Sequence, residues 1–177
     1  MNDVEIRPAD AEEDAAACAA IYAPYVAGAA TSFEETPPGE TELARRIAAA
    51  AERHAWLVAV LEGKVVGFAY AGPHRGRPSY RWSVEVSVYV EEAHHGAGAG
   101  RALYTALLER LRARGFRTAC AGITLPNEAS VALHEGLGFT PIGTYQKIGW
   151  KAGAWRDVGW WQLQLAPQGD EPPPEPH

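Results

Sequence analysis

The strongest constraint on the fold of this chain is an apolar run that is followed at once by a glycine-rich loop. The run is Val88-Tyr89-Val90, the loop is Gly96-Ala97-Gly98-Ala99-Gly100, and an amphipathic pattern starts at about Arg101. A strand, a glycine turn and a helix in this order aim main-chain N–H groups and the positive end of a helix dipole at one point. Glycine also lets the backbone approach a ligand closely. The segment therefore predicts a site for a phosphate or a pyrophosphate.

Two well-known phosphate-binding loops fit this segment poorly. A P-loop requires Lys and then Ser or Thr directly after its last glycine, but Gly100 is followed by Arg101-Ala102. A dinucleotide-binding loop that starts at Gly96 requires a third glycine at position 101, which is Arg101 here. It also requires an acidic residue about 20 positions further on, and the strand predicted near 118–124 contains none. A turn that binds no ligand is the remaining alternative. It is disfavoured because glycines this dense cost conformational entropy at a helix start.

Length and composition favour one globular domain with a packed core. The chain has 177 residues, of which 47% are hydrophobic, and it carries a net charge of −6. We assign residues 1–166 to this domain, and we predict that the Pro- and Glu-rich residues 167–177 form a disordered tail. The negative charge argues against a nucleic-acid partner.

Several features predict a cytoplasmic protein without a membrane partner. No apolar run is long enough to cross a bilayer, and the acidic start at residues 1–5 lacks the basic and apolar parts of a signal peptide. Cys18 and Cys120 lie in apolar patterns and read as buried free thiols of a reducing compartment. No group of residues has metal-ligand spacing, so we expect no metal.

Hydrophobic periodicity predicts an α+β fold with two helices near the N-terminus, an antiparallel meander and a β-α-β-α-β-β continuation. The predicted helices cover residues 10–25, 41–54, 98–114 and a segment that starts at 126–127 and ends at 136 or 138. The predicted strands cover residues 4–7, 56–61, 65–71, 81–90, 118–125, 140–148 and 157–165.

The glycine loop and its flanking residues resemble motif A of the GNAT acyltransferases, which is written Q/R-x-x-G-x-G/A. The matching stretch is His95-Gly96-Ala97-Gly98-Ala99-Gly100, in which His95 replaces the usual Gln or Arg. In that family the loop holds the pyrophosphate of coenzyme A mainly through main-chain N–H groups. The resemblance therefore implies acetyl-CoA as a co-substrate.

Further pieces of the chain, between Ile6 and about Leu165, are similar to the phosphinothricin and methionine sulfoximine acetyltransferase branch of that family. They are Thr31-Ser32-Phe33-Glu34, Trp82-Ser83-Val84-Glu85, Leu125-Pro126-Asn127, Leu133-His134-Glu135-Gly136-Leu137-Gly138-Phe139 and Gly153-Ala154-Trp155-Arg156-Asp157-Val158. The resemblance implies transfer of an acetyl group to the amino group of a small amino acid analogue, by direct transfer within a homodimer. It also implies a mixed central sheet, flanked by helices, whose fourth and fifth strands splay apart, with facing edges at 87–90 and 121–124.

The same resemblance implies which residues hold the co-substrate. The main chain of Val88, Tyr89 and Val90, together with the side chain of Asn127, would bind the pantetheine arm. The pyrophosphate would lie on Gly96, Ala97, Gly98, Ala99, Gly100 and Arg101. Only the main-chain N–H of Arg101 is part of this expectation, because its side chain reads equally well as a solvated helix residue.

Amine acetylation requires a base, because an ammonium ion is not nucleophilic until it loses a proton. Glu85 is the candidate, since it interrupts the apolar run 84–88, and burial of a carboxylate favours its protonated form. An outward-facing glutamate on a half-exposed strand fits the alternation equally well. The resemblance favours the base.

His134 is the second catalytic candidate. It shares one predicted helix face with Asn127 and Ser130, at spacings of seven and four residues. The resemblance implies that it acts as an acid toward the leaving thiolate or as a second base. A structural histidine is the alternative.

The acceptor pocket is predicted from two loops. Phe33 and Glu34 follow the first helix, and Arg75, Arg77 and Tyr80 precede the strand of Glu85. A guanidinium group suits a carboxylate or phosphinate, and the resemblance matches an Arg and a Tyr of the branch to Arg77 and Tyr80. For Arg75, a solvated loop residue is almost as well supported. His74 departs from the branch, which commonly has Trp there.

Two other functions remain open from the sequence. The first is acetylation of another amine, such as a peptide N-terminus or a polyamine, which the basic loop disfavours. The second is a non-catalytic module that binds acyl-CoA, which the joint presence of Glu85, Asn127 and His134 disfavours.

Overall fold

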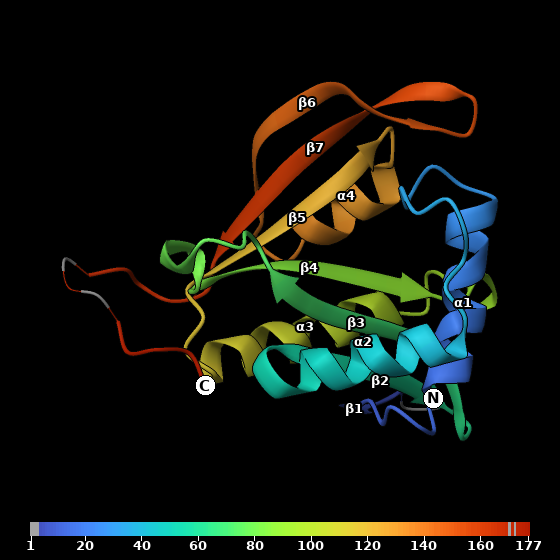
Figure 1. Ribbon diagram of the computed structural model, residues 1–177, viewed down its shortest axis with the longest axis horizontal. Helices are drawn as coiled ribbons and strands as arrows, with labels where there is room; N and C mark the ends of the chain where they lie inside the picture. The colour runs from blue at the N-terminus through green and yellow to red at the C-terminus, as the bar shows by residue number, and fades with distance from the viewer. Residues whose placement is uncertain (1–3, 170, 172) are drawn as a thin grey trace.

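The computed structural model describes residues 4–169, 171 and 173–177, and shows one mixed sheet with helices on both faces (Figure 1). The strand order is β1-β2-β3-β4-β5-β7-β6. The helices are α1 (Ala15–Ala27), α2 (Glu40–Arg53), α3 (Ala99–Ala113) and α4 (Glu128–Glu135), with short 3-10 turns η1 (Pro78–Tyr80) and η2 (Glu92–His94). The strands are β1 (Glu5–Pro8), β2 (Ala55–Leu61), β3 (Lys64–Pro73), β4 (Ser83–Val90), β5 (Thr118–Leu125), β6 (Thr140–Lys151) and β7 (Ala154–Gln164).

The first half of the sheet is buried on both faces, and this explains the continuous apolar runs of its strands. Along β2, Leu57 packs into the cluster beneath α3, whereas Trp56 and Val58 pack into the cluster beneath α1 and α2. Because successive side chains of a strand point to opposite faces, one unbroken apolar run supplies both cores. The glycine-containing turn at Glu62-Gly63 has positive φ at both residues, 51° and 76°, which suits a two-residue hairpin.

Helix α3 lies against β2, β3 and β4 and has the buried face that its sequence predicts. Its residues Leu103, Leu107, Leu108 and Leu111 are all buried in the larger core cluster. Gly98 caps the start of the helix with a φ of 89°, and Gly115 follows its end with a φ of 90°. Both conformations favour glycine, so these two residues set the ends of α3.

The sheet divides between β4 and β5. These parallel strands pair at only three positions, Ser83 with Thr118, Val84 with Ala119 and Glu85 with Cys120. Beyond Glu85 the two strands diverge, although β4 stays paired with β3 as far as Val90 and β5 stays paired with β7 to its end. Figure 1 shows this divergence. The predicted α+β class and the predicted splay of the fourth and fifth strands are confirmed.

The largest differences from the sequence prediction lie at three element boundaries. Helix α1 begins at Ala15 instead of residue 10, because the Asp10 carboxylate accepts the N–H groups of Glu12 and Glu13 in a turn. The last two strands were predicted to stop at 148 and to restart at 157. They instead continue to Lys151 and from Ala154, where Ala152 and Gly153 form a tight turn with φ values of 50° and 73°.

The C-terminal segment contacts the domain where the structure describes it. Arg81 forms an ion pair with Glu175, and the Trp82 indole N–H donates to the Pro174 carbonyl at 2.9 Å. The main-chain N–H of His177 donates to the Arg114 carbonyl at 3.0 Å. The expected disorder of 167–177 stays a prediction, and residues 170 and 172 of this tail lie outside the described residues, as do residues 1–3.

Cys18 and Cys120 are buried and form no disulfide, and burial raises the pKa of the Cys18 thiol to about 12. Within the described ranges, no helix combines the length and the apolar character needed to span a bilayer. The part of the chain that the structure describes also brings together no group of three or more His, Cys, Asp or Glu side chains that could hold a metal.

Candidate active site

A narrow cleft opens where β4 and β5 diverge. Because the two strands no longer pair there, main-chain groups along their facing edges lack a partner strand. Such edges can bind an extended ligand by adding it to the sheet. Most of the lining comes from the two strands and from α4 with its N-cap, and the first loop and α3 add one residue each: Thr31, Val86, Ser87, Val88, Tyr89, Tyr104, Gly122, Ile123, Thr124, Asn127, Ser130 and His134. The predicted facing edges, 87–90 and 121–124, therefore form the two sides of this cleft, although Val90 and Ala121 do not line it.

Helix α4 begins at the wide end of the cleft, and Asn127 caps it. The Asn127 Oδ1 accepts the Ser130 N–H at 3.1 Å, so this oxygen is used by the helix itself. The amide Nδ2 has no recorded hydrogen bond among the described residues and is left to donate to a ligand. The expected grouping of Asn127, Ser130 and His134 on the cleft side of one helix is confirmed.

His134 is buried, with 3% of its surface exposed, and both ring nitrogens have partners. Nδ1 lies 2.7 Å from the Ser130 carbonyl oxygen, which can only accept, so Nδ1 carries the proton. Nε2 then accepts from the Tyr104 hydroxyl at 3.0 Å. Burial lowers the pKa of His134, which keeps the imidazole neutral. In this tautomer Nε2 can take up a proton but has none to give.

The glycine loop presents free main-chain donors at the start of α3. The Ala102 N–H donates to the Gly98 carbonyl and forms the first helical turn. The N–H groups of Ala99, Gly100 and Arg101 therefore have no intrahelical acceptor. Gly96 and Gly98 hold positive φ values of 76° and 89°, which turn the backbone into this arrangement. The loop is shaped to hold an anion such as a pyrophosphate.

His95, which departs from motif A, is held by the end of β4. Its Nε2 lies 2.8 Å from the Tyr25 hydroxyl and 2.9 Å from the Val90 carbonyl oxygen. Tyr25 also donates to the Val90 carbonyl. Val90 therefore has its carbonyl occupied, and among the three residues predicted to bind the pantetheine arm it is the least available. Val88 and Tyr89 line the cleft.

The Arg101 side chain has a structural contact of its own. Its Nη1 donates to the Gly136 carbonyl at 3.2 Å, which ties the start of α3 to the end of α4. From the sequence, only the main-chain N–H of Arg101 is assigned to the pyrophosphate, and the structural contact of its side chain agrees with that assignment.

Glu85 stands at the fork itself, as the last residue of β4 that pairs with β5. Its Oε1 lies 3.0 Å from His74 Nδ1 and accepts from Arg75 Nη1 at 3.3 Å. The side chain is 38% exposed. The surroundings are therefore polar and partly open, not apolar as the flanking valines suggested, because alternation turns Glu85 away from the core face that Val84 and Val86 occupy.

The predicted acceptor residues of the first loop have different environments. Glu34 is held by Arg46 at 2.7 and 3.0 Å and by the Tyr22 hydroxyl at 3.0 Å. The Arg46 guanidinium lowers the pKa of Glu34, so the carboxylate is ionised and already paired. Phe33 packs on Gly149 of β6, where an added Cβ would lie 2.5 Å from the ring. Glu34 thus fixes the loop, whereas Phe33 remains exposed.

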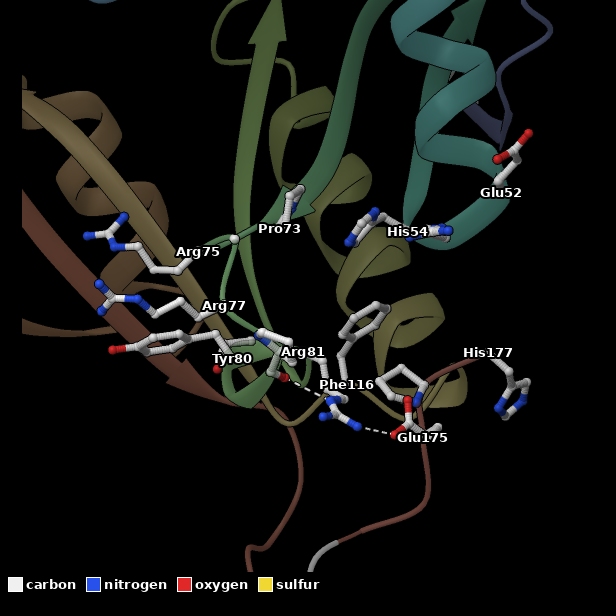
Figure 2. A pocket seen from close by; sticks show the side chains of 15 residues that line it. Glu52, His54, Pro73, Arg75, Arg77, Tyr80, Arg81, Phe116, Glu175 and His177 are labelled. Carbon is white, nitrogen blue, oxygen red and sulfur yellow. Dashed lines mark hydrogen bonds and ion pairs between the residues drawn. The ribbon is translucent and has the colours of Figure 1, made fainter.

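Arg75, Arg77 and Tyr80 come together in the β3–β4 connection. Figure 2 shows these three side chains extending to the same side, whereas Arg81 turns to Glu175 of the tail. They border a cavity of about 450 Å³ that the tail also lines. Among the described residues, the Arg77 guanidinium has no recorded hydrogen bond or ion pair, so it is available to an oxyanion.

Four residues at the site carry roles that the sequence did not reveal. Tyr104 lies among the buried leucines of α3, and its hydroxyl faces His134 Nε2 at 3.0 Å. Trp160 packs over Gly122, where an added Cβ would lie 3.2 Å from the indole, and meets the His74 ring edge-on. Asp157 accepts the main-chain N–H of Lys147, whose φ is 49°, and so stabilises a bulge in β6. His74, which departs from the pattern of the branch, lies beside Glu85 with its Nδ1 3.0 Å from Oε1.

The site has one region suited to the pyrophosphate of coenzyme A and another suited to its pantetheine arm. The free N–H groups at the start of α3 suit a pyrophosphate, and the unpaired strand edges suit the amides of a pantetheine arm. The fork then places Glu85 at the narrow end of the cleft, and the glycine loop follows the other end of β4. Such a geometry can hold an acyl thioester beside a base.

Comparison with known proteins agrees with this geometry. Residues 13–139 match the family model described as the acetyltransferase (GNAT) family. The phosphinothricin N-acetyltransferase of Streptomyces viridochromogenes is 45% identical over 159 residues, which cover 90% of this chain and 86% of that relative. The L-methionine sulfoximine/L-methionine sulfone acetyltransferase of Pseudomonas aeruginosa is 38% identical over 158 residues, with 86% and 90% covered.

A solved structure supports the same conclusion. The GNAT superfamily phosphinothricin acetyltransferase of Sinorhizobium meliloti, solved in complex with acetyl-CoA, superposes with a TM-score of 0.92 and 36% identity, covering 99% of this chain and 95% of that one. The resemblance that the motifs indicated is thereby confirmed, and the chain belongs to the acetyltransferase (GNAT) family.

Proposed function

We propose that this protein transfers an acetyl group from acetyl-CoA to the amino group of a small amino acid analogue that carries an oxyanion, of the phosphinothricin or methionine sulfoximine type. The observation that carries the proposal is the fork of the sheet. One strand, β4, has the candidate base Glu85 where the cleft begins, and its C-terminal end leads into the glycine loop. Relatives named for those two substrates match most of the chain.

The residues of the chain have separate roles in this reaction. When bound, acetyl-CoA supplies an acetyl group activated as a thioester. The loop at positions 96–101 holds the pyrophosphate, with the N–H groups of Ala99, Gly100 and Arg101 as free donors, because the Ala97 N–H donates to the His94 carbonyl. Val88, Tyr89 and Asn127 hold the pantetheine arm. Glu85 accepts the proton that the acceptor ammonium loses, so that a neutral amine forms in the site.

His134 is neutral and its Nε2 is unprotonated, as a second base requires. Its Nε2 carries a lone pair that the Tyr104 hydroxyl already faces, and its pKa is lowered by burial. Of the two roles considered from the sequence, this tautomer supports the base over the acid. We propose that His134 acts as this base at the cleft, because both Tyr104 and His134 form part of the cleft lining.

The acceptor side is cationic, which supports an acceptor with a negative group. Arg75 and Arg77 extend from the β3–β4 connection together with Tyr80, and Phe33 adds an exposed aromatic face from the first loop. Glu34 is neutralised by Arg46, so it presents little charge to a ligand. A polyamine would meet unfavourable charges here. A peptide N-terminus remains the alternative among neutral or anionic acceptors.

We also propose a cytoplasmic homodimer. Strand β6 is a 12-residue edge strand, and apolar side chains stay exposed along it and on β7: Ile142, Tyr145, Ile148, Trp150 and Trp155. A long apolar edge invites pairing with another chain, and a second copy is the commonest partner for such a surface. The two buried thiols suit a reducing compartment.

The first prediction concerns the acceptor. Thiol release from acetyl-CoA is measured with phosphinothricin, methionine sulfoximine and spermidine in parallel. The two amino acid analogues are expected to exceed spermidine in kcat/KM by about 100-fold, because like charges brought together cost a few kcal/mol. Spermidine as the best acceptor would contradict the proposed acceptor class, and binding without turnover of any amine would support a non-catalytic module.

The Glu85→Gln variant, measured with the best acceptor, is expected to lose about 100-fold in kcat, in the range that one general base contributes.

The second prediction concerns the glycine loop. Gly98→Ala is expected to weaken acetyl-CoA binding about tenfold, because a left-handed conformation costs an alanine roughly 1–2 kcal/mol. Gly39→Ala, before α2, is the matched control, since no heavy atom lies within 4 Å of the added Cβ and its φ of −80° suits alanine. Calorimetric titration of both folded variants measures the difference. Equal affinities would show that the backbone shape at Gly98 does not hold the co-substrate.

The third prediction concerns assembly. Sedimentation equilibrium should give a mass of twice 19.1 kDa for the native chain. Ile148→Glu places a charge on the exposed apolar face of β6 and should yield monomers, whereas Ala49→Glu, on an exposed position of α2, should not. A native chain that sediments as a monomer at micromolar concentration would refute the dimer.

A further inference from the structure

We propose that His74 is a positioning residue for Glu85: its imidazole holds one carboxylate oxygen so that the other is aimed at the acceptor amine. This inference rests on the proposed function, in which Glu85 accepts the ammonium proton. Neither His74 nor Glu85 lines the cleft between the diverging strands, and the role of His74 is argued from its contact with Glu85.

Both partners of the Glu85 carboxylate bind the same oxygen. His74 Nδ1 lies 3.0 Å from Oε1, and Arg75 Nη1 donates to that same atom at 3.3 Å. In the described part of the chain, no hydrogen bond to Oε2 is recorded. A carboxylate offers about four lone-pair sites on its two oxygens. The carboxylate is therefore anchored at one end, and its other oxygen is left for a proton that a ligand brings.

The His74 side chain is itself fixed from three directions. Its main-chain N–H donates to the Ser83 carbonyl at 3.3 Å, which places the residue at the end of the β3–β4 ladder. Its ring meets the Tyr80 ring edge-on with centroids 5.8 Å apart, and the Trp160 ring edge-on at 6.1 Å. Only 18% of the side chain is exposed. A ring held in this way has little rotamer freedom left to lose when it restrains a partner.

Glu85 needs such a restraint because its own surroundings do not supply one. The side chain is 38% exposed, it lies where pairing with β5 stops, and it has several rotatable bonds. A general base must reach its proton at about 2.6–3.2 Å. The Arg75 guanidinium is 47% exposed and pairs at a longer distance, so it restrains the carboxylate less than the less exposed His74 imidazole does.

Two substitutions separate the hydrogen bond from the ring. His74→Asn keeps an N–H donor at the third heavy atom from Cα, where Nδ1 stands, whereas His74→Phe keeps a ring between Tyr80 and Trp160 without a donor. For His74→Phe, kcat should fall about tenfold, as expected when a base is misplaced by a fraction of an ångström. KM for both substrates should change less than about twofold, because the loss falls on proton removal and not on binding. His74→Asn should recover most of the native kcat.

A spectroscopic measurement on the protein without substrates tests the contact directly. The Nδ1 resonance of His74, assigned by its loss in His74→Asn, should move in the Glu85→Gln variant. Glu91→Gln is the matched control, because Glu91 pairs with His94 at 3.0 Å in a comparable His–Glu pair. That variant should leave the His74 resonance in place. A His74 signal that ignores Glu85→Gln would overturn the inference.

The kinetic outcomes separate this inference from the function on which it rests. Native kcat in Glu85→Gln would remove Glu85 as the base and would thereby contradict the proposed mechanism. A large loss in Glu85→Gln together with native kcat in a folded His74→Phe would overturn only the role of His74. Equal losses in His74→Phe and His74→Asn would also overturn it, because a retained donor would then have restored nothing.

Discussion

The early end of pairing between β4 and β5 is the constraint on which the rest of the site depends. Three residue pairs join the two strands, and the last of them is Glu85 with Cys120. A fully paired sheet would satisfy every main-chain group along β4 and would leave no room for a ligand. The fork instead creates a cleft with two polar edges. It also sets Glu85 at the point where the edges separate, so the candidate base and the candidate co-substrate site have one structural origin.

The elements around the fork are held so that this cleft stays open. On one side, the hydrogen bonds of Glu34 to Arg46 and Tyr22 fix the first loop against α1 and α2. On the other side, Asn127 caps α4, and Tyr104 holds His134 from α3. The Arg101 side chain joins α3 to α4. Charged and polar residues that look like ligand contacts in the sequence are thus partly used to support the cleft, and Glu34 is the clearest example.

The features that the sequence predicted well are set by residues close to them along the chain. The glycine loop, the buried face of α3 and the turn at residues 62–63 each depend on neighbours within one or two turns of chain. The fork came from the family resemblance, because no property of 83–90 or 118–125 taken alone says that their pairing stops at Glu85. The extension of the last two strands was missed for a related reason. The bulge at Lys147 is stabilised by Asp157 from the facing strand, ten residues away.

The chemistry of the site was predicted less fully than its location, since it depends on contacts between distant segments. The apolar neighbours of Glu85 suggested a buried carboxylate, but His74 and Arg75 of the preceding loop surround it. The Ser130 carbonyl, four residues earlier on the same helix, sets the tautomer of His134. The partner of Nε2 is the Tyr104 hydroxyl, 30 residues earlier, and no pattern distinguishes Tyr104 from a core residue. The role of Arg77 at the acceptor stays a prediction. Residue type and spacing thus indicated candidate groups for the site, but not which of them neutralise or orient one another.

The most direct measurement of the central claim is hydrogen–deuterium exchange of the main-chain amides with and without acetyl-CoA. We expect binding to slow exchange at 86–90, at 121–125 and at 98–101, because a ligand would then occupy donors that the fold leaves without a partner. The amides of β1 and β2, which are already paired on the far side of the sheet, should exchange at an unchanged rate. Unchanged exchange at both strand edges, in a folded protein saturated with acetyl-CoA, would contradict the account.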